Sequence, residues 1–256
     1  MSETLDILFQ DEHLVAINKP HGLLVHRSEI DRHETRFALQ ILRNQLGQHI
    51  YPVHRLDKPT SGIMVFALSS TAAQKIGQLF TTHQLQKTYL AIVRGHCIGE
   101  GLIDHPLKED PDKFVNTQDK PAQAAITKYK HLASIELPFS VDKYPSSRYS
   151  LVECQPLTGR KHQIRRHLKH INHPIIGDAK HGKGRHNRMF QEQLGIQRLL
   201  LAATELEFTH PYTQALLRLS APLESSFDQL LVNFGWRDKI PTRWQSAHQF
   251  TTTTQA

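Results

Sequence analysis

Alternating and clustered apolar positions divide the chain into short predicted strands. Two apolar-rich runs, Leu5 to Gln10 and Leu14 to Asn18, are separated by a polar turn and predict a hairpin. The continuous apolar run Ile63 to Leu68 has the length of a buried strand rather than of a helix. The other predicted strands cover 23–25, 87–94, 124–132, 148–155, 175–178, 199–203 and 205–208.

Apolar residues spaced by three or four positions predict the helices. The serines and threonine at 69–71 can cap one of them, because their side-chain oxygens accept the first free backbone N–H groups. The predicted helices cover 34–46, 72–80, 161–171, 189–194 and 223–234. Strands and helices do not alternate regularly and no repeat is present, so the pattern favours an α+β fold with a mainly antiparallel sheet.

The chain shows no Pro- or Gly-rich linker, which favours one folded domain over residues 1–236. Residues 237–256 form a polar tail, and its low-complexity end is expected to be partly disordered. No apolar run approaches the 18 or so residues that a membrane span needs. The N-terminus lacks a secretory signal, and two cysteines make no disulfide framework, so a cytoplasmic protein with reduced thiols is expected.

Positive charge is concentrated in one segment, Thr158 to Arg188. The segment holds nine lysines and arginines and one acid, a net charge of +8, while the whole chain carries +7. A local excess of this kind is typical of a surface that binds nucleic-acid phosphates. A solvated basic face with no ligand is the alternative.

Known cofactor and metal motifs are missing from the sequence. His167, His170 and His173 have helical spacing, but no Glu or Cys accompanies them in a metal-binding pattern. The surrounding positive charge would also weaken cation binding. Neither a phosphate-binding loop nor a dinucleotide-binding glycine pattern is present. We therefore expect neither a metal nor a cofactor.

The stretch 54–62 places charged and turn-forming residues at the start of the buried strand 63–68. Its sequence is His-Arg-Leu-Asp-Lys-Pro-Thr-Ser-Gly. Taken alone, Asp57 can serve as a turn residue that accepts backbone N–H groups. The same carboxylate, with Arg55 nearby and the basic segment elsewhere in the chain, could instead be catalytic.

Four ordered motifs resemble those of the RluA-type pseudouridine synthases. The stretch 54–62 resembles the family signature, and 19–26 resembles its first motif. Residues 87–95 resemble the tyrosine motif, and 158–167 together with 173–178 resemble the third motif. The resemblance implies a pseudouridine synthase fold, with a mixed, mainly antiparallel sheet flanked by helices and a central active-site cleft.

The implied activity is the isomerisation of uridine to pseudouridine in RNA. The short chain, without an S4 RNA-binding domain, and residues 177–182 are similar to family members that act on position 65 of tRNA, in the T-stem. The implied partner is tRNA, with no protein partner, no membrane and a monomeric enzyme. Two alternatives stay open: a ribosomal RNA enzyme of the same family, and a non-catalytic RNA-binding module.

The resemblance also implies roles for individual residues. Asp57 would act on the ribose of a flipped-out uridine, either as a nucleophile at C1′ or as a base at C2′. Arg165 would keep it ionised, Tyr89 would stack on the uracil, and Arg55 would fill the space that the nucleotide leaves. The expected pocket residues are Leu56 and Ile164. The expected further RNA contacts are Arg160, Lys161, His162, Arg166, Lys169 and Lys180.

Overall fold

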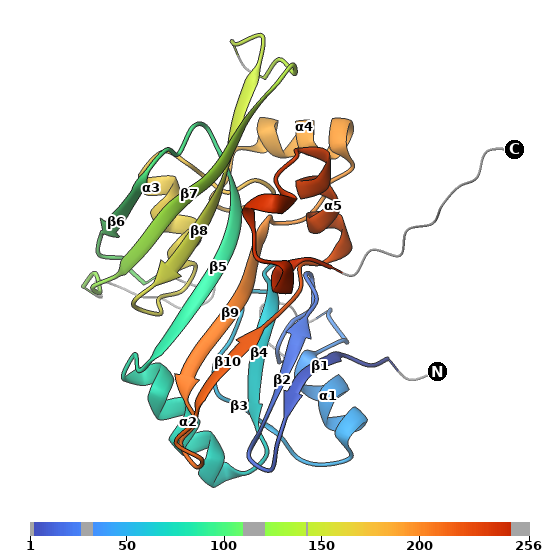
Figure 1. Ribbon diagram of the computed structural model, residues 1–256, viewed down its shortest axis with the longest axis vertical. Coiled ribbons are helices and arrows are strands. Elements are labelled where there is room, and N and C mark those ends of the chain that lie inside the picture. Colours follow the sequence, from blue (N-terminus) through green and yellow to red (C-terminus); the bar gives the residue numbers. More distant parts are fainter. Residues whose placement is uncertain (1–2, 27–32, 110–120, 142, 247–256) are drawn as a thin grey trace, which may run out of the picture.

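A computed structural model describes residues 3–26, 33–109, 121–141 and 143–246. One large sheet spans the molecule in the order β1-β2-β4-β9-β5-β8-β7-β6, with β3 paired to β4 and β10 paired to β9 (Figure 1). The strands are β1 Asp6–Gln10, β2 Leu14–Lys19, β3 Tyr51–Pro52, β4 Ser61–Ala67, β5 Leu85–Arg94, β6 Glu100–Asp104, β7 Ile126–Leu137, β8 Ser147–Pro156, β9 Leu201–Thr209 and β10 Leu216–Ser220.

The described helices lie on both faces of this sheet. They are α1 Ala38–Leu46, α2 Ser70–Thr81, α3 Gln163–His170, α4 Gly184–Leu194 and α5 Ser225–Asn233, with two short 3-10 turns at Arg237–Lys239 and Thr242–Trp244. Every strand pair is antiparallel except β4 with β9, which is parallel. The predicted α+β fold with a mixed, mainly antiparallel sheet is confirmed.

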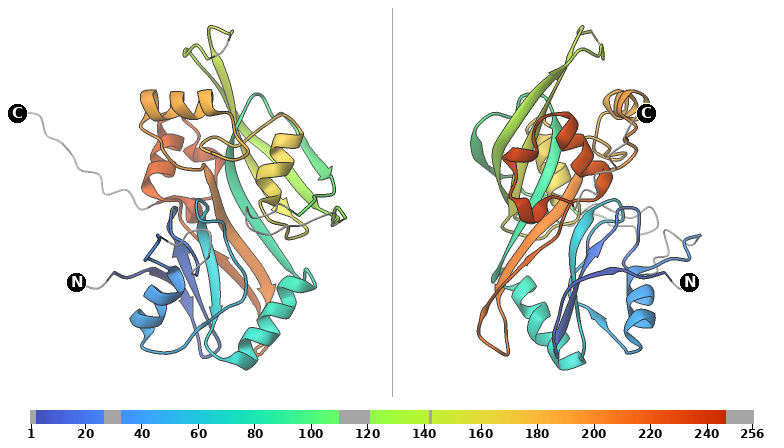
Figure 2. Two further views of the ribbon diagram at one scale, coloured as in Figure 1. Left: turned by 180° about the vertical axis from the view of Figure 1, so that it is seen from behind. Right: turned by 45° about the vertical axis from the view of Figure 1, so that its right-hand side comes forward.

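Side-chain alternation along β4 explains how α1 and α2 are placed. Met64 and Phe66 pack with Leu42 of α1 in one cluster, whereas Ile63 packs with Ile76 of α2 in another. Successive residues of a strand point to opposite faces, so the two helices cover opposite faces of β2 and β4. Figure 2 shows α1 and α2 on either side of these strands.

The same alternation organises β5. Leu90 packs in the cluster that includes α4 and α5, whereas Ala91 and Val93 pack with Leu168 of α3 on the opposite face. Tyr89 packs against the α3 side, on the same face as Ala91 and Val93, as its spacing predicts. The tyrosine is therefore directed to the face on which the basic helix lies.

The two halves of the sheet meet at a short junction. β4 and β9 pair through only two residue pairs, Ser61 with Ala202 and Gly62 with Ala203. Gly62 has φ +108°, and a Cβ there would lie 2.1 Å from the Ala203 carbonyl oxygen. Only glycine fits this close approach, so the last residue of the 54–62 stretch fixes how the halves join.

Several predicted boundaries were wrong. The first helix begins at Ala38 rather than at 34, because Phe37 is buried and bridged to Leu24. The predicted strands 199–203 and 205–208 form the single strand β9, and 175–178 contributes only a bridge between Ile175 and Val93. The strands β6 and β10 were not predicted.

The C-terminal part of the chain is more folded than its composition predicts. Ile240 and Trp244 are buried with α5 in one core cluster, so packed structure extends past the predicted boundary at Trp236. Most of the predicted 106–121 loop and the end of the tail lie outside the described residues. Both cysteines are buried and free, as predicted.

Candidate active site

The residues of the 54–62 stretch lead directly into the junction of the two half-sheets. A turn closes where the Thr60 N–H donates to the Asp57 carbonyl oxygen at 3.0 Å, and β4 begins at the next residue. Thr60 and Ser61 are buried. The turn is thus closed by the backbone of Asp57, whereas its side chain, which the turn interpretation expected to accept backbone N–H groups, lines a cavity.

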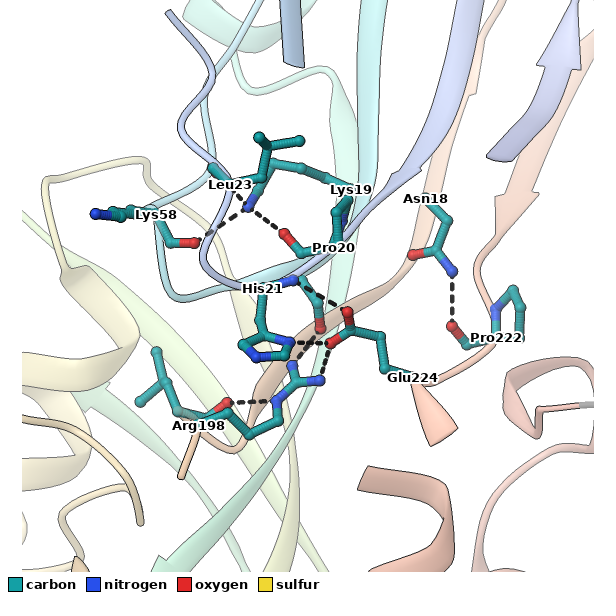
Figure 3. A network of polar contacts seen from close by, with 11 residues as sticks. Asn18, Lys19, Pro20, His21, Leu23, Lys58, Arg198, Pro222 and Glu224 are labelled. Carbon is teal, nitrogen blue, oxygen red and sulfur yellow. Dashed lines mark hydrogen bonds and ion pairs between the residues drawn. The ribbon is translucent and has the colours of Figure 1, made fainter. Parts of the chain in front are cut away.

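Arg198 ties this turn to the C-terminal half. Its guanidinium donates to the Ser61 hydroxyl at 2.6 Å and pairs with Glu224, which also pairs with His21 at 2.9 Å (Figure 3). Burial lowers the pKa of Arg198 to about 10, so it stays charged at neutral pH. The sequence analysis missed Arg198 and Glu224. The one indication in the sequence was that Arg198, a charged residue, directly precedes the apolar run 199–203.

Lys19 holds the same turn from the N-terminal side. Its ammonium is fully buried and donates to the carbonyl oxygens of Pro20 and Leu23 at 2.8 Å and of Lys58 at 3.2 Å (Figure 3). Burial, with the nearby Arg198, lowers the pKa of Lys19 to about 7. Lys19 therefore links the loop that holds Pro20 and Leu23 to the loop that holds Lys58 by hydrogen bonds to their carbonyl oxygens.

The carboxylate of Asp57 faces the guanidinium of Arg165. Nη1 of Arg165 donates to Oδ2 of Asp57 at 3.0 Å, across 108 positions of sequence. The rest of the guanidinium is held by Asp178, through Nε to Oδ2 at 2.7 Å and Nη2 to Oδ1 at 2.8 Å. The structure thus brings the two residues together, and it adds Asp178, which the sequence analysis did not include in the site.

Burial and pairing compete in setting the charges of this group. Burial alone would raise the pKa of Asp178, but the hydrogen bonds from Arg165 outweigh it and the pKa lies below its usual value. The pKa of Arg165 is raised, because its two carboxylate partners outweigh burial. Asp178 and Arg165 are therefore both expected to be charged at neutral pH.

Tyr89 lines the same cavity from β5. Burial first, and then the charge of Asp57, raises the pKa of its phenol. The phenol is therefore protonated at neutral pH and can donate a hydrogen bond. Leu56 and Ile164, the expected pocket residues, are buried and line the cavity with apolar groups.

The cavity has a volume of about 420 Å³. It is lined by most of the predicted site residues, namely Arg55, Leu56, Asp57, Tyr89, Arg160, Lys161, His162, Ile164 and Arg165. Arg166, Lys169 and Lys180 do not line it: Lys169 and Lys180 are exposed, and Arg166 donates to the Lys108 carbonyl oxygen at 2.8 Å. These three remain predicted RNA contacts outside the cavity.

Two titratable residues that line the cavity, Lys87 and His54, were not among the predicted site residues. Lys87 contributes an ammonium 3.4 Å from the Thr158 carbonyl oxygen, and burial lowers its pKa. His54 accepts the Val65 N–H at 3.0 Å and stacks on Phe80. Burial, and then Lys87, lowers the pKa of His54 to about 3, so its ring is neutral. Both residues were visible in the motifs, but no pattern there marks them as pocket residues.

Over the described ranges, no group of three or more His, Cys, Asp or Glu side chains is placed to hold a metal ion. Among the helices of those ranges, none has both the length and the apolar character needed to cross a membrane. The cavity instead joins one carboxylate, a paired guanidinium, a phenol and apolar walls. Such a set can bind a flat polar ring, and it can act on an electrophilic carbon or an acidic proton.

Comparisons with known proteins agree with this geometry. The RNA pseudouridylate synthase family matches residues 13–170. The tRNA pseudouridine synthase C of Vibrio cholerae serotype O1 is 53% identical over 239 residues, covering 92% of this chain and 98% of that protein. The protein of the same name from Pasteurella multocida is 52% identical, covering 91% and 97%.

A solved structure has the same fold. Human RNA Pseudouridylate Synthase Domain Containing 4 superimposes with a TM-score of 0.67 at 29% identity, covering 90% of this chain and 93% of that one. Human RNA Pseudouridylate Synthase Domain Containing 1, at 22% identity, gives a TM-score of 0.66 and supports the fold alone. The family match and the near full-length relatives show that this chain belongs to the RNA pseudouridylate synthase family.

Proposed function

We propose that this protein isomerises uridine to pseudouridine in tRNA, at position 65 in the T-stem, with Asp57 acting on the ribose. The observation that carries the proposal is the contact between Asp57 and Arg165 inside a cavity that Tyr89 also lines. The tRNA substrate is proposed because relatives about half identical to this chain are named tRNA pseudouridine synthase C.

The reaction breaks the N1–C1′ bond, turns the uracil in the cavity and forms a C5–C1′ bond. The uracil loses the proton on C5 and gains one on N1, so atoms and electrons balance without a redox partner. Asp57 can attack C1′ or remove the proton on C2′, and its contact with Arg165 serves both routes by orienting the carboxylate beside a positive charge.

The other side chains hold the flipped nucleotide. Tyr89, with its protonated phenol, would stack on the uracil between Leu56 and Ile164. Arg55 is exposed at the edge of the cavity, where a planar guanidinium can occupy the space that the flipped base leaves. Extrusion of a base costs a few kcal/mol, and this stacking offsets part of it.

The basic segment would hold the RNA backbone around the cavity. Arg160 and Lys161 line the cavity, whereas Lys169 and Lys180 are exposed outside it. We further propose that residues 1–246 act as one catalytic unit and that the protein works as a monomer in the cytoplasm, where its tRNA substrate is found.

Release of tritium from C5-labelled uridine tests the proposal. We expect release from tRNA by the parent protein and none by Asp57→Asn, which keeps the size of the side chain but removes its charge. Mapping of the product should place pseudouridine at position 65. Full activity of folded Asp57→Asn would refute the catalytic role.

The same assay separates the alternatives. Release only from ribosomal RNA would assign the enzyme to another substrate of the family. Binding of RNA without release from any RNA would indicate a non-catalytic module. Unmodified transcripts of both RNAs are needed, because RNA from cells can already carry the product.

A further inference from the structure

His162 is held beside Asp57 by a backbone conformation that residues with a Cβ rarely adopt. Its φ is 56°, in the left-handed region, immediately before α3. Its Nε2 lies 3.8 Å from Oδ2 of Asp57, and its side chain is only 15% exposed. Unusual backbone conformations of this kind concentrate at functional sites, because the surrounding structure must maintain them.

A second histidine determines which ring nitrogen of His162 carries hydrogen. Nδ1 of His162 lies 3.0 Å from Nε2 of His181, and one of these atoms must donate. If His162 donated, the lone pair of its Nε2 would face the Asp57 carboxylate, which is unfavourable. Donation by His181 instead leaves an N–H on Nε2, directed at an acceptor.

The two histidines complete a ring of contacts around the reactive carboxylate. The backbone N–H of His181 donates to Oδ1 of Asp178 at 2.9 Å. Asp178 holds two nitrogens of Arg165, and Arg165 donates to Asp57. The ring therefore runs from Asp57 through Arg165, Asp178, His181 and His162 back to Asp57.

Within this ring, the side chains of Arg165 and His162 both approach the same oxygen of the Asp57 carboxylate, Oδ2. Nη1 of Arg165 lies 3.0 Å from Oδ2, and Nε2 of His162 lies 3.8 Å from it. The longer distance exceeds that of a hydrogen bond, but catalytic hydrogen bonds often shorten when substrate binds. Two donors on Oδ2 would fix the rotation of the carboxylate.

Resting on the proposed function, we propose that His162 is a positioning residue. Its Nε2–H closes on Oδ2 of Asp57 in the RNA complex, and His181 fixes the tautomer. Together with Arg165, His162 then leaves Oδ1 as the oxygen that acts on the ribose. This role differs from the RNA contact that the sequence analysis expects of His162.

Two substitutions of His162 separate these roles in the full-length protein. His162→Gln retains an amide N–H near the position of Nε2, whereas His162→Asn retains one only near Nδ1. We expect His162→Asn to lower kcat about 100-fold, with KM and the Kd for tRNA changed less than twofold. The kcat of His162→Gln should be at least tenfold higher than that of His162→Asn.

The matched control is His170→Asn, at an exposed histidine of the same helix that does not line the cavity. Its kcat should equal that of the parent. His181→Leu, which removes the tautomer-fixing partner and leaves α3 unchanged, should lower kcat about tenfold. This variant also keeps the proposal testable if His162→Asn does not fold, as judged by thermal unfolding.

Two results would overturn the positioning role. One is an unchanged kcat in both His162→Asn and His181→Leu. The other is a Kd for tRNA that rises in both His162 variants while kcat stays at the parent value, which would make His162 an RNA contact only. Failure of the proposed function is seen separately, because the parent would then release no tritium from any RNA.

Discussion

Replacement of Asp178 by Asn tests how the reactive carboxylate is held. The Asp178 side chain is fully buried, and it accepts two hydrogen bonds from Arg165 and two from the backbone N–H groups of Lys180 and His181. The Asp178→Asn substitution would keep the shape of the side chain but would remove its charge. Arg165 would then have Asp57 as its one remaining carboxylate partner in this group.

The magnitude follows from the burial of the pair. Loss of one partner of a buried ion pair costs about 3–5 kcal/mol, and the lower end applies here because Asp57 still pairs with Arg165. For a chain of this size, 1 kcal/mol corresponds to roughly 2–4 °C in Tm, so we expect the Tm to fall by roughly 6–12 °C at pH 7. Activity should fall as well, because Arg165 loses the contacts that orient it.

The effect must depend on pH with a defined sign. The folded-state pKa of Asp178 is lowered, so the stabilisation it provides is present above its unfolded value of about 4 and is lost as the pH falls through the folded value. Thermal unfolding of parent and Asp178→Asn should therefore differ at pH 7 and converge below about pH 4. Equal Tm values at pH 7, or a difference that grows in acid, would refute the reasoning.

Three further outcomes are expected. Gly62→Ala should destabilise the protein by on the order of 3 kcal/mol in denaturant unfolding, because a Cβ at φ +108° meets the Ala203 carbonyl group; parent-like stability would contradict the close junction. Tyr89→Phe removes the one hydroxyl group that Tyr89 brings to the cavity for hydrogen bonding or proton transfer, so kcat should fall about 100-fold with unchanged tRNA affinity, and an unchanged kcat would leave Tyr89 only a stacking role. Arg160→Ala should reduce the slope of log Kd against log salt by roughly 0.7–0.9, and an unchanged slope would exclude a phosphate contact.

The fold could be predicted wherever the apolar pattern was strong. The six-residue run 63–68 was recognisable as a strand because both of its faces are covered by helices. β6 and β10 were missed because each has a single buried side chain, Ile103 and Leu219 respectively, and its other residues are exposed or only partly buried. Such edge strands carry too little alternation to be seen in a sequence.

The candidate site was predictable in its motifs but not in its contacts. The resemblance alone linked Asp57 to Arg165, because no local pattern connects residues so far apart in the chain. Lys19 was recognised as part of a motif, but its carbonyl contacts depend on how two loops meet, the one that holds Pro20 and Leu23 and the one that holds Lys58. Arg198 satisfies its charge through Glu224, a residue on another segment, and only the folded structure shows that partner.

The junction between β4 and β9 also has a consequence for synthesis of the protein. Ser61 pairs with Ala202, about 140 positions later in the chain. During translation the N-terminal strands can emerge and pair long before β9 exists, yet Asp57 cannot meet Arg165 or be braced through Arg198 until the C-terminal half has left the ribosome. A chain that ends before β9 would therefore be inactive, and catalytic activity would appear only after β9 has been translated.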